Sequence, residues 1–110
     1  MTGTTLEQVQ MKVDDWINQF EEGYWPPLSM LASLVEEVGE LAREINNLEK
    51  IKKKKTSEPD VDLCMEIADI FFSLICIANH YGVNLEYSFK KVMEKYTIRD
   101  NKRWTKKEQL

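Results

Sequence analysis

The stretch VEEVGELAREI, residues 35–45, decides the fold because it joins a regular apolar stripe to three crowded glutamates. Its apolar side chains recur at intervals of three and four residues, which is the period of one face of an α-helix. Glu36, Glu37 and Glu40 lie within one and a half turns of that helix. Like charges at this spacing repel by about 0.2 to 0.5 kcal/mol per pair, so the acids need a compensating interaction.

The same helical period extends over most of the chain and predicts four helices. Thr4 and Glu7 have the spacing of a capping box for the first helix, and Gly82 suits the end of the third. No strand alternation stands out, so the expected fold is all-α, an up-and-down bundle of about four helices. The helices are expected from about Leu6 to Phe20, from about Pro27 to Leu48, from the start signals Ser57 and Pro59 to Gly82, and onward from Asn84.

Length and charge predict one cytoplasmic domain over residues 1–110, with a basic tail from about residue 100. A chain of 110 residues fits a single domain with a modest core. The net charge of -4 argues against a dedicated nucleic-acid binder. The first ten residues, MTGTTLEQVQ, lack the cationic start and the apolar centre of a signal peptide, so we expect a cytoplasmic location.

Glu66 and Asp69 interrupt the most apolar segment of the chain, LCMEIADIFFSLICIAN, residues 63–79. The uncharged run after Asp69 is shorter than the roughly 18 to 20 residues that span a bilayer, so we expect the centre of a bundle rather than a membrane. The E-x-x-D pair repeats the spacing of the E-x-x-E pair Glu37 and Glu40. Two antiparallel helices could therefore place the two pairs face to face.

Four carboxylates that face one another inside a bundle favour a divalent metal. Burial of an ionised carboxylate costs on the order of several kcal/mol. Burial raises the pKa of the carboxyl group, and like-charged neighbours raise it further. The ligands are hard oxygens, which suit Mg²⁺ or Mn²⁺ better than zinc. Two other interpretations stay open: a solvated acidic surface, because E-x-x-E is common by chance, and a di-iron centre, which the single histidine His80 disfavours.

The chain resembles the MazG-type nucleotide pyrophosphohydrolases of the all-α NTP pyrophosphatase superfamily. The resemblance rests on LVEEVGELAREI, on EIADIFFSLICIANHYGVNLEYSF and on KYTIR, and it covers roughly residues 28–103. The family signature, E-E-x-x-E followed by E-x-x-D one helix later, is present in full. The resemblance implies a bundle of the MazG-like type that assembles as a homodimer or a dimer of dimers, with pockets at or near the subunit contact.

The resemblance also implies an activity and a role for each acid. A nucleoside triphosphate would be hydrolysed to its monophosphate and pyrophosphate, with Mg²⁺ held by Glu37, Glu40, Glu66 and Asp69 and with Mn²⁺ as an alternative. Glu36 is the candidate catalytic residue, as a general base or as the group that orients the water; a solvated surface acid is the competing interpretation. The expected biological role is house-cleaning, the removal of unwanted nucleotides, with a deoxynucleotide or a non-standard nucleotide favoured as substrate.

Cations and aromatic rings complete the expected substrate site. Lys95 and Arg99 match the basic residues of the family at the end of the last helix, and Arg103 follows. They would bind the phosphates, although a solvated basic helix end is the competing interpretation. Trp25, in a proline-containing loop, is the favoured residue for stacking on the base; Trp16 is a second candidate, for which core packing is the more common fate.

Two functions without catalysis serve as alternatives. One is a small helical adaptor whose acids only solvate a bundle and whose lysine run docks an acidic partner. The other is a protein that binds nucleic acid through the basic loop KIKKKK, residues 50–55. Neither alternative requires acids inside the apolar third helix, so the sequence favours the enzyme.

Overall fold

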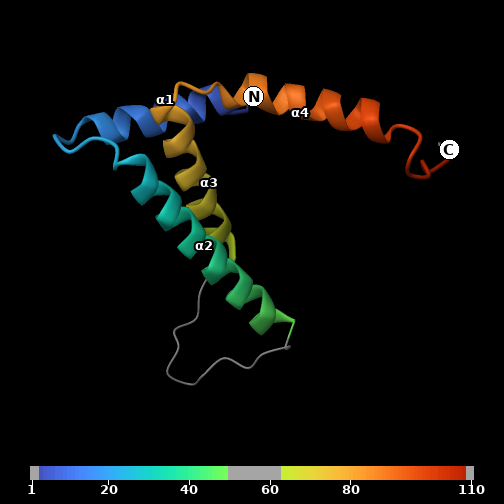
Figure 1. Ribbon diagram of the computed structural model, residues 1–110, viewed down its shortest axis with the longest axis horizontal. Helices are drawn as coiled ribbons and strands as arrows, with labels where there is room; N and C mark the ends of the chain where they lie inside the picture. The colour runs from blue at the N-terminus through green and yellow to red at the C-terminus, as the bar shows by residue number, and fades with distance from the viewer. Residues whose placement is uncertain (1–2, 50–62, 109–110) are drawn as a thin grey trace.

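The computed structural model describes residues 3–49 and 63–108 of the chain. Within these ranges the regular structure is entirely helical, which confirms the predicted all-α class (Figure 1). The helices are α1 (Leu6–Asn18), α2 (Pro27–Leu48), α3 (Leu63–His80) and α4 (Leu85–Asp100). The predicted start signals of the third helix and the lysine run lie outside the described residues.

The first helix begins one residue later than its predicted capping box. Thr5, rather than Thr4, is the N-cap: its Oγ1 accepts a hydrogen bond from the backbone N–H of Gln8 at 3.1 Å. The Gln8 side chain in turn accepts from the backbone N–H of Thr5 at 2.8 Å. The Thr4 and Glu7 prediction was wrong because two adjacent threonines offer two registers, and glutamine closes a capping box as well as glutamate does.

The turn between α3 and α4 follows the sequence signals. Gly82 adopts a left-handed backbone with a φ of 68°, which a glycine reaches without steric cost. The Val83 N–H then donates to the carbonyl of Ala78 at 2.8 Å and satisfies a free carbonyl at the helix end. Asn84 caps α4 by accepting from the N–H of Tyr87 at 3.0 Å. These predictions of the turn are confirmed.

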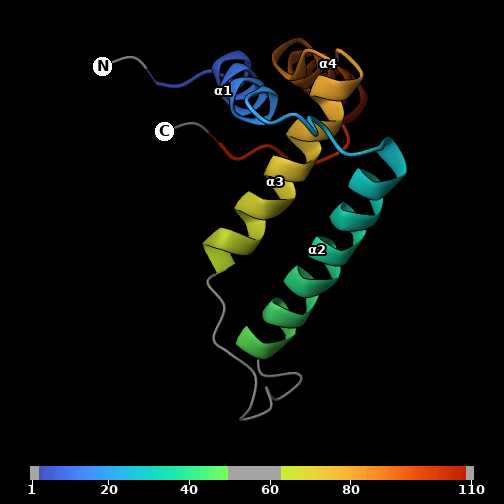
Figure 2. The same ribbon diagram turned by 90° about the vertical axis from the view of Figure 1, so that its left-hand side faces the viewer.

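The helices do not form a closed up-and-down bundle within one chain. Helices α2 and α3 lie side by side and antiparallel, whereas α1 and α4 cross the end of this pair (Figures 1 and 2). Helix α4 contacts α1 and then extends away from the α2–α3 pair. The prediction of a bundle therefore needs correction for the single chain, because helical periodicity identifies apolar faces but not which helix covers each face.

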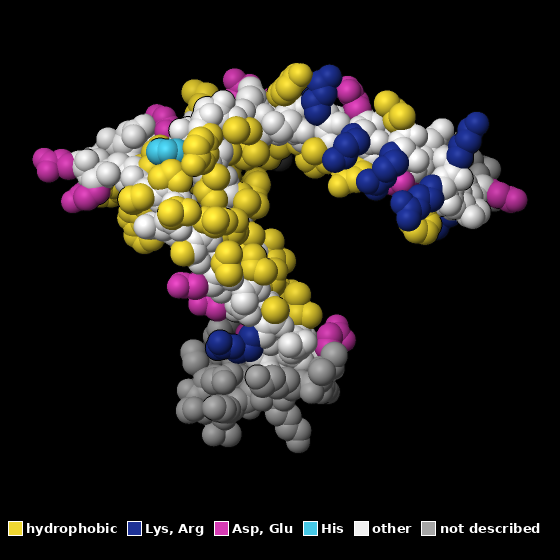
Figure 3. All heavy atoms as spheres, viewed as in Figure 1, with side chains coloured by type: hydrophobic (Ala, Val, Ile, Leu, Met, Phe, Trp, Pro, Cys, Tyr) yellow, Lys and Arg dark blue, Asp and Glu magenta, His cyan; other side chains and the backbone are white. Residues whose placement is uncertain are grey.

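The extended shape leaves much of the apolar surface uncovered. The radius of gyration is 18.1 Å, against about 13 Å for a compact domain of this length. On α2, Val35 and Val38 are 63% and 48% exposed although they belong to the predicted apolar stripe. Hydrophobic side chains accordingly cover wide areas of the face in Figure 3. The buried apolar core of the described residues is small and consists of Met30, Ile75, Cys76 and Ala78.

A buried glutamine fastens α1 to the turn between α3 and α4. Gln10 is 8% exposed, and its Nε2 donates to Asn79 Oδ1 at 2.9 Å and to the carbonyl of Val83 at 2.8 Å. Its Oε1 accepts from the backbone N–H of Leu85 at 2.8 Å. One side chain thus satisfies polar groups on both sides of the turn, which holds α1 and α4 against the end of α3.

Among the described helices, α3 alone is long and apolar enough to cross a membrane, judged by length and composition only. It carries Glu66 and packs against both α2 and α1. Only 22% of the helix is buried within the chain, so its predicted position at the centre of a bundle stays a prediction.

Candidate active site

Carboxylates from two antiparallel helices meet at the centre of the α2–α3 pair. Helix α2 supplies Glu37 and Glu40, and α3 supplies Glu66. One oxygen from each of the three lies within 4.8 Å of the others, which is close enough for a single cation to contact all of them. The structure therefore brings together three of the four predicted metal ligands.

Glu66 shows most clearly that this cluster suits a cation. The residue is 7% exposed, and its Oε2 is buried without a hydrogen-bond partner in the described part of the chain. Burial, and then the charges of Glu40, Asp69 and Glu44, raise its carboxyl pKa above the ordinary value. A divalent ion with oxygen ligands, such as Mg²⁺ or Mn²⁺, would satisfy the orphaned oxygen and offset the repulsion.

Glu37 is half-buried at the edge of the cluster. Burial raises its pKa most, followed by the charges of Asp69, Glu40 and Glu66. Asp69 is exposed and lies outside the group of three, yet its charge acts on both Glu37 and Glu66. Glu36 is exposed and contributes the smallest named effect on Glu37, so it borders the cluster rather than joining it.

Glu44 is a member of this acidic region that the sequence reasoning missed. It lies one turn after Glu40 on α2, it is 7% exposed, and its charge raises the pKa of Glu66. The spacing of four residues from Glu40 was visible in the sequence, but only tertiary packing shows that Glu44 faces inward.

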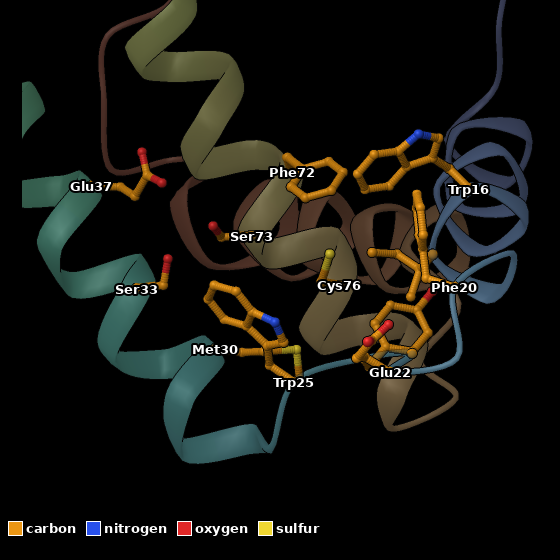
Figure 4. A pocket seen from close by; sticks show the side chains of 13 residues that line it. Trp16, Phe20, Glu22, Trp25, Met30, Ser33, Glu37, Phe72, Ser73 and Cys76 are labelled. Carbon is orange, nitrogen blue, oxygen red and sulfur yellow. The ribbon is translucent and has the colours of Figure 1, made fainter.

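A cavity of about 500 Å³ opens directly beside the acids. Its lining comes from α1, α2, α3 and the loop between α1 and α2, and Glu37 belongs both to the lining and to the acid cluster (Figure 4). Trp25 projects into it from the loop (Figure 4). A volume of this size lies within the usual range for small-molecule sites, and its wall is mainly apolar and aromatic.

Trp16 is a cavity wall residue rather than the core residue that helical spacing favoured. It is 53% exposed, and its ring packs edge-on against Phe20 at 5.2 Å and against Phe72 at 6.2 Å between ring centroids. The three rings form a contiguous aromatic surface at the end of the cavity away from Glu37 (Figure 4). Amphipathic spacing could not distinguish the two fates, because both place the ring on the inner face of α1.

Tyr24 lines the same cavity but has its hydroxyl committed elsewhere. The hydroxyl donates to Asp14 Oδ1 at 2.6 Å and accepts from Asn79 Nδ2 at 3.0 Å. Burial and the hydrogen bond to Asp14 raise its pKa to about 12. Its ring can therefore serve as a surface for stacking, whereas its hydroxyl holds the loop in place.

The predicted phosphate-binding residues lie in the second half of α4 and just after it, and α4 extends away from the α2–α3 pair that carries the acids (Figure 1). Arg99 forms a forked pair with Asp100, with Nη2 to Oδ2 at 2.8 Å, and Arg103 lies 3.6 Å from the same carboxylate. Lys95 sits over the ring of Tyr96 at 5.0 Å from its centroid. Within one chain, these cations and the acid cluster are separate features.

The helical fold, the paired acids and the adjacent aromatic cavity together define an all-α protein with a carboxylate cluster suited to a divalent cation beside a small-molecule cavity. The MazG nucleotide pyrophosphohydrolase domain matches residues 26–104. The chain therefore belongs to the MazG nucleotide pyrophosphohydrolase family. The match includes the whole acid cluster and the whole of α4.

Individual relatives agree with this assignment. The protein YpjD of Bacillus subtilis is 46% identical over 109 residues, which cover 99% of this chain and 98% of YpjD. YvdC of the same organism is 31% identical over 96 residues, which cover 78% of this chain and 91% of YvdC.

Solved structures show the same fold. The crystal structure of Bacillus subtilis YpjD matches with a TM-score of 0.78 at 45% identity, over 87% of this chain and 98% of that one. A Bacillus-conserved MazG protein, described as a nucleotide pyrophosphohydrolase, matches with a TM-score of 0.74 at 38% identity, over 87% of this chain and 92% of that one. The fold and the family are thus established by independent comparisons.

Proposed function

We propose that this protein hydrolyses a nucleoside triphosphate to its monophosphate and pyrophosphate in a reaction that depends on Mg²⁺, with Mn²⁺ as a substitute. The observation that carries the proposal is the position of Glu37, which belongs both to the acid cluster and to the aromatic cavity. A ligand bound here would have phosphates at one end and a flat ring at the other. A nucleotide has this shape, and the family membership supports the same reaction.

The clustered acids would hold the metal, and the neighbouring Glu36 would orient and deprotonate the attacking water. Glu37, Glu40 and Glu66 supply the three convergent oxygens, and Asp69 adds charge beside them. A divalent cation bound there supplies positive charge that offsets the phosphate charge in the transition state. We assign Glu36 to orient the attacking water and accept its proton, while the bond between the α-phosphorus and the bridging oxygen breaks and pyrophosphate leaves.

The aromatic end of the cavity would hold the base. Trp25 and Trp16 offer large flat surfaces, and stacking on such rings tolerates different bases. A house-cleaning enzyme benefits from such tolerance, since it must accept more than one damaged or surplus nucleotide. We therefore favour a deoxynucleotide or a non-standard nucleotide as substrate.

A homodimer or a dimer of dimers would bring the missing cations to the site. The single chain leaves apolar surface on α2 and α4 uncovered, including Ile98, which is 82% exposed. A second copy that covers this surface would gain the hydrophobic free energy that one chain forgoes. We infer that Lys95, Arg99 and Arg103 of one copy approach the acids of another and bind the leaving pyrophosphate.

The reaction is tested by product analysis with and without Mg²⁺. A panel of ribo- and deoxyribonucleoside triphosphates should yield monophosphate and pyrophosphate only when the metal is present. Glu37→Gln should abolish both turnover and stabilisation by the metal, whereas Glu36→Gln should lower turnover and leave the stabilisation intact. Release of orthophosphate, or equal activity of the Glu37 variant, would refute the proposal.

The shared site is tested by mixing two inactive variants. Glu37→Gln removes an acid, and Arg99→Ala removes a cation. If each site draws on two copies, random reassociation of equal amounts should restore about a quarter of the wild-type activity, because half of the dimers then contain one intact site. No recovery after verified subunit exchange would mean that each chain supplies its own cations.

A further inference from the structure

Two serines occupy the level between the acid cluster and the aromatic wall. Ser33 lies one turn before Glu37 on α2, and Ser73 lies one turn after Asp69 on α3. Because the two helices are antiparallel, these steps lead in the same direction, away from the acids. Both side chains line the cavity, and Figure 4 shows their hydroxyls pointing into the space between α2 and α3, with Glu37 on one side and Trp25 on the other.

Neither serine hydroxyl has a hydrogen-bond partner within the part of the chain that the structure describes. Both residues are half-buried and line the cavity. A serine hydroxyl can also bond back to a carbonyl of the preceding turn, but neither of these does so. The pair is therefore available to a molecule in the cavity.

We propose that Ser33 and Ser73 form a sugar subsite that recognises the 3′-hydroxyl of the substrate nucleotide. This inference rests on the proposed function, which places phosphates at the acids and the base at the aromatic wall. The sugar joins the phosphates to the base, so it would lie between the acids and the aromatic wall, beside the two serines. One helical turn is about 5.4 Å along the axis, a step of the same order as that from a phosphate to the hydroxyl-bearing carbon of its own sugar.

The chemistry of the two groups is complementary. A serine hydroxyl donates one hydrogen bond and accepts others, and a sugar hydroxyl does the same. Two serines on opposite helices can donate to and accept from one sugar hydroxyl at once. Because a hydrogen-bonding site rejects an analogue that leaves its polar groups unpaired, the enzyme should discriminate against 2′,3′-dideoxynucleotides.

The test removes the 3′-hydroxyl from the substrate, the serine hydroxyls from the enzyme, or both together. The kcat/KM for a 2′-deoxynucleoside triphosphate is compared with that for its 2′,3′-dideoxy analogue, using wild type, Ser33→Ala, Ser73→Ala and the double variant. Wild type should prefer the deoxynucleotide by about three- to ten-fold, as expected for loss of one or two neutral hydrogen bonds. The double variant should lose this preference, so that its kcat/KM values for the two substrates become equal.

Ser29→Ala is the matched control, since Ser29 is an exposed serine on α2 outside the cavity lining. It should keep the wild-type preference. Alanine is a good helix former, so all the variants should fold, and thermal unfolding verifies this. Absence of a preference in wild type, or an undiminished preference in the double variant, overturns the sugar subsite alone; absence of turnover with every triphosphate overturns the proposed function together with it.

Discussion

Replacement of Gln10 by leucine should destabilise the protein through lost hydrogen bonds rather than lost volume. The side chain is 8% exposed and makes three hydrogen bonds of 2.8 to 2.9 Å, to Asn79, to the Val83 carbonyl and to the Leu85 N–H. Leucine preserves most of the shape but leaves these three groups unpaired. At about 1 kcal/mol for each bond, the free energy of unfolding should fall by about 3 kcal/mol.

Urea unfolding followed by circular dichroism measures this loss. Wild type and variant are compared at one protein concentration, because self-association would make apparent stability depend on concentration. Gln19→Leu is the matched control: Gln19 is exposed at the end of α1, and its change should stay within about 0.5 kcal/mol. If Gln10→Leu cost no more than this control, the hydrogen-bonded junction would not hold α1 to the α3–α4 turn, and the reasoning would be refuted.

The remaining predictions concern the site. Glu66→Gln should raise the thermal midpoint of the metal-free protein near neutral pH, because it removes a buried repelled charge, and should abolish stabilisation by added MgCl₂; calorimetry that shows undiminished stabilisation would exclude Glu66 as a ligand. The pKa values of Glu37 and Glu66 are raised, so the folded state binds their protons more tightly than the unfolded state does. The contribution of these two groups to stability without metal should therefore be greatest below the ordinary carboxyl pKa of 4.5 and decline as pH rises through the raised values. Protons compete with the cation, so the metal-induced rise in midpoint should be larger at about pH 8 than at about pH 5.5, and the opposite order would contradict this assignment. Trp25→Ala should lower kcat/KM by about 5- to 150-fold through lost stacking, whereas Trp25→Phe retains most of it; equal losses in steady-state kinetics would argue against a stacking role.

Local signals in the sequence were sufficient for the helices but not for their arrangement. Pro27 begins α2 and Gly82 follows the end of α3 as predicted, because the backbone preferences of proline and glycine act at the residue itself. The capping box was placed one residue too early, since neighbouring threonines have similar propensities. Helix packing could not be derived in this way, because apolar stripes attract any other apolar face.

In the candidate site too, some features followed from helical spacing and others depended on packing between helices. Glu37 and Glu40 share a helix, so their proximity followed from helical spacing, and the position of Glu66 opposite them required only the antiparallel pairing of α2 and α3. The inward position of Glu44 and the cavity-facing position of Trp16 depend on packing between helices. No pattern in a single sequence encodes such packing directly.

The sequence by itself determined the helices, the acid pairs and their preference for a hard divalent cation, because these follow from local backbone preferences and the chemistry of carboxylates. Only the tertiary structure decided that the acids adjoin an aromatic cavity, that two serines lie between the acids and the aromatic wall, and that α4, which carries the cations, extends away from the acids of its own chain. The physical reason is that hydrophobic attraction is non-directional. It drives apolar faces together, and the shapes of the packed side chains select which faces meet.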